Sequence, residues 1–132
     1  MSSEQQAVKK YRDLQIGELN FIHTTDTHGW LGSHLNEENY DATWGDLISF
    51  VDKLRQNVIK ENDLLLIDTG DKHDGNGLSD ATIPNGLNST QIFNEMNYDL
   101  LTLGNHELYV EDNTVLEFYE TASNPKFKGK YV

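Results

Sequence analysis

The run "DLLLIDTGD", residues 63–71, decides how this chain folds. Four consecutive apolar residues (64–67) end in polar residues and a glycine. A continuous apolar run of this length is typical of a strand buried on both faces of a parallel sheet. Asp71 directly follows Gly70, so a charged side chain stands where the strand ends. The stretch therefore predicts an inner strand with a polar group at its carboxyl end.

Two further apolar runs repeat this pattern, one on each side of the first. "LNFIHTT" (19–25) contains β-favouring residues and is followed by Asp26 and His28. "YDLLTLGN" (98–105) ends in a Gly-Asn pair. Each run predicts a strand that finishes in a polar cluster.

Helical patterns separate and follow the three runs. A helix over residues 43–60 is predicted by apolar residues spaced four, three and four apart, at Leu47, Val51, Leu54 and Val58. A second helix is predicted to begin after a cap at Asn88 or Ser89 and to reach Asn97, and a third is predicted over residues 114–122. Strands that alternate with helices predict the α/β class, built from parallel βαβ units.

Length and composition exclude several classes of protein. The chain has 132 residues, 36% of them hydrophobic and 24% charged, which predicts one globular domain. Ten Lys+Arg against 22 Asp+Glu give a net charge of −12, so we expect neither nucleic acid nor anionic membranes as partners. The absence of cysteine excludes disulfides and thiolate zinc sites.

The amino-terminal segment, residues 1–18, is a polar lead-in without the apolar core of a signal peptide. No apolar stretch approaches the roughly 18 residues of a membrane span. The sequence favours a cytoplasmic location by default and leaves a vacuolar or extracellular one open.

The three polar clusters are expected to meet. Ligands gather at the carboxyl ends of parallel strands, and each gap between clusters is long enough for one crossover of about 30 residues. Carboxylate, imidazole and amide donors suit Mn, Fe or Zn in the absence of thiolates. A triplet such as Asp26-Thr27-His28 is an ordinary polar turn when taken alone. Its recurrence in phase with two similar clusters favours a metal site.

Three motifs in this order resemble a known family. "DTH" (26–28), "GDKHDG" (70–75) and "GNHE" (104–107) are similar to the first three motifs of the calcineurin-like metallophosphoesterases. The longer stretches "IHTTDTHGW", "LLIDTGDKHDGNGLSD" and "LLTLGNHEL" look most like the 5′-nucleotidase branch, including fungal nucleotidase-like proteins. The likeness extends over residues 19–124. It implies part of the αββα sandwich of that family.

The resemblance also implies roles for individual residues. Asp26 and His28 would bind one divalent metal ion, Asp71 would bridge two, and Asn105 would bind the second. His106 would be the catalytic histidine near the leaving group. The implied cofactors are two divalent ions, Mn, Zn or Fe, and the implied reaction is the hydrolysis of a phosphoric monoester. The implied partner is a small phosphorylated substrate, with a nucleotide as the expected class.

The chain departs from the family in two respects. Its five histidines include none after His106, whereas the family completes its site with later Gly-His and Gly-His-x-His motifs. Residues 19–132 are therefore expected to be the amino-terminal part of a metallophosphoesterase domain, inactive when isolated, with the remaining part of the protein as a partner. Tyr109 stands where the bacterial nucleotidases have an aspartate that orients the histidine. Asp74 either matches a second aspartate motif of the broader family or caps a turn.

Alternative functions stay open at this point. A catalytically inactive remnant or interaction module would keep the sheet without the chemistry. A phosphodiesterase or sugar-nucleotide hydrolase would use the same pair of metal ions on a different ester. Binding of Mn or Zn separates the first alternative from an enzyme.

Overall fold

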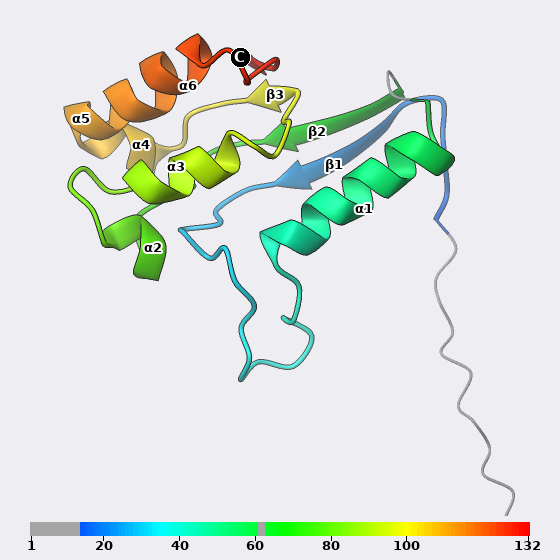
Figure 1. Cartoon of the computed structure of the whole chain (residues 1–132), viewed down its shortest axis with the longest axis horizontal. Coiled ribbons are helices and arrows are strands. Elements are labelled where there is room, and N and C mark those ends of the chain that lie inside the picture. Colours follow the sequence, from blue (N-terminus) through cyan, green and yellow to red (C-terminus); the bar gives the residue numbers. More distant parts are fainter. Residues whose placement is uncertain (1–13, 61–62) are drawn as a thin grey trace, which may run out of the picture.

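The computed structural model describes residues 14–60 and 63–132. Four parallel strands form one sheet in chain order, β1 (Asn20–Thr24), β2 (Leu64–Asp68), β3 (Leu100–Leu101) and β4 (Lys130–Tyr131). Figure 1 shows β1, β2 and β3 side by side, with helices between them along the chain. The predicted α/β class with a parallel sheet is confirmed. Most of the predicted lead-in, residues 1–13, lies outside the described residues, and residues 14–18 form neither helix nor strand.

Seven helical segments accompany the sheet in the described part of the chain: α1 (Trp44–Asn57), α2 (Gly77–Asp80), α3 (Leu87–Phe93), α4 (Asn105–Tyr109), α5 (Glu111–Thr114), the π-helical η2 (Val115–Glu120) and α6 (Thr121–Ser123). None of the helices in residues 14–60 and 63–132 is both long and apolar enough to cross a membrane.

Helix α1 begins where its sequence provides a reciprocal cap. The Thr43 hydroxyl accepts a hydrogen bond from the Asp46 amide, and the Asp46 carboxylate accepts one from the Thr43 amide. Val51 and Leu54 are buried, as the predicted stripe requires. Val58 is 58% exposed, so its predicted inward position is wrong. The helix ends at Asn57, and Ile59, which follows Val58, is buried in the core instead.

One face of the sheet carries the core. Leu64 and Leu66 of β2 and Leu101 of β3 are buried there against side chains of α1 and of the α3 segment. Leu65 and Ile67 of β2 point to the other face and are only half-buried, so the prediction that this strand is buried on both faces is wrong. Burial alternates along the strand because helices cover one side of it in the described residues.

Several predicted boundaries also need correction. The second helix begins at Leu87 after Gly86 and ends at Phe93, so neither predicted cap residue lies outside it. Strand β3 has two residues because the chain after Leu101 turns toward α4 instead of extending to residue 105. The predicted final helix is a continuous helical run, with α-helical ends and a π-helical centre.

Candidate metal centre at the carboxyl ends of the strands

The turns that follow β1 and β2 are joined to each other through their backbones. The Asp26 amide donates to the Gly70 carbonyl at 3.0 Å, and the His28 amide donates to the Asp71 carbonyl at 3.0 Å. The Gly29 amide donates to the Lys72 carbonyl at 2.8 Å, and this bond continues the ladder beyond the sheet. The two polar clusters that the sequence predicts at these strand ends are therefore held side by side.

The backbone of these turns is unusual for residues with side chains. Asp26, His28, Asp71 and Asp74 all have positive φ, between 45° and 65°. Left-handed residues other than glycine are uncommon, although Asp, Asn and His adopt this conformation more readily than others. Such conformations persist where the surrounding structure enforces them, and they concentrate at functional sites. Three of these four are predicted metal ligands.

The turns after β2 and β3 approach too closely for side chains. Gly70 has φ of 96°, and a Cβ atom there would lie 2.1 Å from the backbone nitrogen of Gly104. A Cβ atom on Gly104 would lie 2.2 Å from a carboxylate oxygen of Asp71. Only glycine at both positions allows Asp71 to lie directly against the third polar cluster.

Three predicted site residues converge. His28, Asp71 and His106 each offer one ligand atom, and these atoms all lie within 4.8 Å of one another. The His28 and His106 rings meet edge to face, with 4.7 Å between their centroids. Two imidazoles and a carboxylate at this spacing form a donor set that a divalent transition metal accepts.

The other two predicted ligands lie on the same turns but outside this group. The Asp26 side chain is exposed and accepts a hydrogen bond from the Thr25 hydroxyl. The Asn105 amide nitrogen donates to the Tyr109 hydroxyl at 2.6 Å, which leaves its amide oxygen available. Their roles as ligands stay a prediction.

Contacts of their Nδ1 atoms orient the two histidines. His28 Nδ1 lies 2.8 Å from the Asp74 carbonyl oxygen, which leaves Nε2 as the ligand atom. His106 Nδ1 lies 3.2 Å from Asp74 Oδ2, and the His106 amide donates to Asp71 Oδ1 at 2.9 Å. Asp74 is thus the residue that faces His106, whereas the sequence left its role open. Tyr109 contacts the His106 ring by tilted stacking.

The Asp74 carboxylate is ionised in this setting. Partial burial acts to raise its pKa, but hydrogen bonds from Asn85, His73 and His106 outweigh burial and lower the pKa below its ordinary value. The Asn85 amide donates to Asp74 Oδ1 at 2.5 Å. Asp74 therefore places a negative charge beside the His106 ring.

Charged groups that the sequence did not single out lie directly behind the donor cluster. Lys72 is 4% exposed, and its Nζ atom lies 3.0 Å from a carboxylate oxygen of Glu117, which is 1% exposed. The Lys72 ammonium also lies 5.1 Å from the centre of the Phe93 ring. No local pattern predicts this pair, because its partners are far apart in the sequence.

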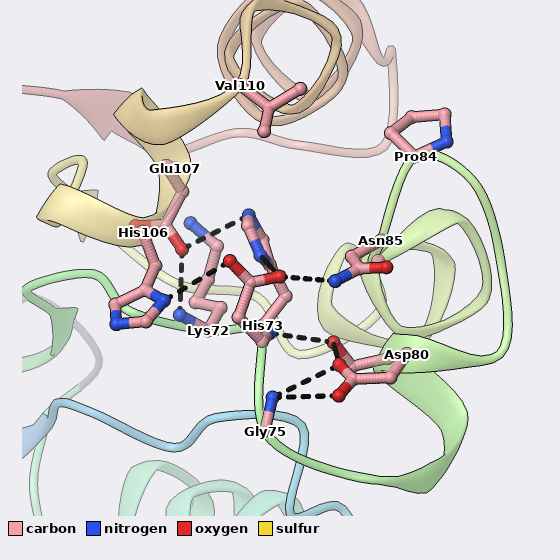
Figure 2. Close-up of polar contacts among 12 residues, drawn as sticks. Lys72, His73, Gly75, Asp80, Pro84, Asn85, His106, Glu107 and Val110 are labelled. Carbon is pink, nitrogen blue, oxygen red and sulfur yellow. Dashed lines mark hydrogen bonds and ion pairs between the residues drawn. The ribbon is translucent and has the colours of Figure 1, made fainter.

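Glu107 and His73 form a second buried pair in the same region. Glu107 is fully buried, and Figure 2 shows its side chain beside His106, His73 and Lys72. Burial acts to raise the pKa of Glu107, but the Lys72 charge and three backbone amides lower it below its ordinary value. The motif containing Glu107 could have drawn attention to it, although nothing in the motif reveals its contacts.

One cavity lies at the opposite end of the sheet. It has a volume of about 430 Å³ and is lined by residues that include Arg55, Asp99 and Lys128. A smaller cavity of about 240 Å³ borders Trp30 and Leu78, next to the turn that carries His28. The donor cluster itself lines neither cavity.

A family model described as calcineurin-like phosphoesterase matches residues 19–131. The crystal structure of a 5′-nucleotidase from Candida albicans superposes with a TM-score of 0.81 at 57% identity, covering 92% of this chain and 23% of that one. An uncharacterized protein of Saccharomyces cerevisiae, YHR202W, is 62% identical over 122 residues, which are 92% of this chain and 20% of that protein.

Mammalian sequences are more distant. The 5′-nucleotidase of Rattus norvegicus is 32% identical over 98 residues, which are 68% of this chain and 16% of that protein. The chain thus spans about a fifth of the length of the relatives it matches.

Proposed function

Because the chain belongs to the calcineurin-like phosphoesterase family, we propose that it carries the first part of the catalytic centre of a phosphoric monoester hydrolase that uses two divalent metal ions. The convergence of His28, Asp71 and His106 is the observation that supports this proposal most directly. A 5′-nucleotide is the substrate class we propose, because relatives described as 5′-nucleotidases match the same residues. In this proposal residues 19–132 are the amino-terminal part of a metallophosphoesterase domain.

The proposed ligands are Asp26 and His28 for one ion, Asp71 between both ions, and Asn105 for the second. The donor set fits divalent ions, since among the contacts described the His28 Nε2 atom, the Asp71 Oδ2 atom and the Asn105 amide oxygen are all left free. Such ions would supply charge for phosphoryl oxygens and lower the pKa of a water molecule.

His106 is proposed to act on the leaving group. Its Nδ1 atom faces Asp74, so its Nε2 atom is free to donate a proton to the departing oxygen. The Asp74 carboxylate fixes the orientation of the ring, while the amide of His106 ties it to Asp71. In this proposal Asp74 orients His106, the role that an aspartate at the position of Tyr109 has in the bacterial nucleotidases.

The isolated chain tests the proposal. We expect it to bind Mn²⁺ weakly and to hydrolyse phosphate monoesters at far below the roughly 1 to 1000 turnovers per second of ordinary enzymes. The reason is that this sequence has no histidine after residue 106 to complete the second ion's ligands. Calorimetric titration with Mn²⁺ and Zn²⁺ is the measurement. A complete lack of binding would favour the inactive remnant instead, and ordinary turnover would refute the assignment of an incomplete centre.

A further inference from the structure

Glu107 is a buried acid that no part of the proposed mechanism uses. Its side chain is 0% exposed, and it sits three residues into the turn that begins α4. An ionised carboxylate in such a position needs several strong partners, because burial without them costs several kcal/mol. Its partners therefore indicate what it does.

The carboxylate of Glu107 joins the two turns that carry the predicted ligands. Its Oε2 atom accepts from the Asp71 amide at 2.8 Å and from the Gly104 amide at 2.7 Å. Its Oε1 atom accepts from the Lys72 amide at 2.8 Å. A single oxygen atom thus bridges the turn after β2 and the turn after β3, which no backbone ladder connects at this point among the contacts described.

A second route leads from the same carboxylate toward His106. His73 is 1% exposed, with Nε2 at 3.6 Å from Glu107 Oε1 and Nδ1 at 3.0 Å from Asp74 Oδ1. The other oxygen of Asp74 faces His106 at 3.2 Å. His73 thus lies within reach of both acids, and Figure 2 shows it beside Glu107. Glu107 is therefore connected both to the backbone of Asp71 and to the group that orients the proposed catalytic histidine.

We propose that Glu107 is the positioning residue that sets the spacing between Asp71 and the Asn105–His106 segment, and that metal affinity depends on its carboxylate although it binds no metal. This inference rests on the proposed function, because it concerns the same metal centre. Glycines at 70 and 104 let the turns meet, and without Glu107 the buried amides of Asp71 and Lys72 and the half-buried amide of Gly104 would lose their acceptor. The turns would then separate to reach water.

The test compares Glu107→Gln with Glu117→Gln in the full chain. Both substitutions remove a buried carboxylate that lies near Lys72, so they match in the kind of damage they cause. Glu117 receives its side-chain bonds from the Thr90 hydroxyl and the Lys72 ammonium, and among the contacts described its carboxylate accepts from no backbone amide of either ligand-bearing turn. We expect Mn²⁺ affinity to fall at least about 10-fold in E107Q, in line with other outer partners of metal ligands, and less than about 3-fold in E117Q. An equal loss in both variants would overturn the proposal.

Amide hydrogen exchange without metal provides a measurement that does not depend on the proposed function. In the wild-type chain the amides of Asp71, Lys72 and Gly104 should exchange slowly, and fast exchange there would overturn the proposal even if no variant folds. In E107Q these three amides should exchange at least about 10-fold faster while core amides of β2 change less. If the wild type binds no metal, the proposed function fails, and exchange still decides whether Glu107 joins the turns.

Discussion

The two ends of the same parallel strands are built on different physical terms. At the amino ends, Arg55 and Asp99 form a 2.5 Å ion pair that is partly exposed, beside an open cavity. At the carboxyl ends, charged side chains are buried in pairs and ligand residues adopt left-handed backbone. The partly exposed ion pair at the amino ends stabilises the fold at little cost in desolvation. The arrangement at the carboxyl ends costs stability, and backbone strain of this kind concentrates at functional sites.

A substitution at the carboxyl ends of the strands should have the largest effect, which is a loss of Mn²⁺ affinity. Asp71→Asn keeps the left-handed conformation accessible but removes the charge, so we expect Mn²⁺ affinity to fall at least about 100-fold. With Mn²⁺ at 100 times the wild-type Kd, the metal should stabilise the wild type by about 2.7 kcal/mol and the variant by only about 0.4 kcal/mol. Thermal unfolding with and without Mn²⁺ measures this. The exposed Asp52→Asn is the control, and an unchanged metal response in D71N would contradict the proposed site.

Breaking the amino end should affect stability alone. Asp99→Asn removes the partner of Arg55 and weakens the bond that the Leu66 amide donates to the same carboxylate at 2.6 Å. We expect a loss of about 1 to 2 kcal/mol in the free energy of unfolding. Urea denaturation measures this loss, and the Mn²⁺ affinity should stay within about 2-fold of wild type. If Mn²⁺ affinity fell together with stability in D99N, the separation of roles between the two ends would be contradicted.

Acid should distinguish two carboxylates at the carboxyl end. The pKa of Glu107 is lowered, so its contribution to stability is present above the unfolded-state pKa and is lost as pH falls through the lowered folded-state pKa. Burial raises the pKa of Asp68 against hydrogen bonds from Thr24 and Gly70, so its ionisation opposes folding, and stability is regained as pH falls through its raised folded-state pKa.

The measurement is urea denaturation from pH 7 to pH 3. The stability advantage of wild type over E107Q should shrink toward acid. The difference between wild type and D68N should move in the opposite direction. If both stability differences changed in the same direction with pH, the assigned directions of the two pKa shifts would be contradicted.

The smallest effect is expected at Tyr109. Tyr109→Phe removes the hydroxyl that accepts from Asn105 but keeps the ring against His106. Because this bond is exposed, we expect a loss of less than about 1 kcal/mol in stability and a change of less than about 3-fold in Mn²⁺ affinity. Calorimetric titration of Y109F and Asp74→Asn would show which residue supports His106. A larger effect in Y109F would reverse that assignment.

The strand order and the position of the site were predictable from the sequence because they depend on local patterns. Apolar runs that end in polar clusters identify β1, β2 and β3, and parallel pairing brings their ends together. The two-residue length of β3 was not predictable. Tertiary contacts of the chain after Leu101, not the composition of the run, end that strand.

The supporting contacts of the site were beyond the sequence. Asp74 faces His106 and Glu107 accepts from the Asp71 amide, and in each case the partners are more than 30 residues apart. Such contacts depend on how turns approach each other in space, which the glycines at 70 and 104 permit but do not encode. The sequence predicted a common place for His28, Asp71 and His106, which converge, and the structure adds what holds them there.

The less covered face of the sheet has a practical consequence for handling the chain. Phe21 is 67% exposed, and Leu65 and Ile67 beside it are half-buried. The charge of −12 makes copies of the chain repel one another at low ionic strength. Added salt screens that repulsion within about 10 Å at 0.1 M, so light scattering should detect self-association that grows with sodium chloride concentration.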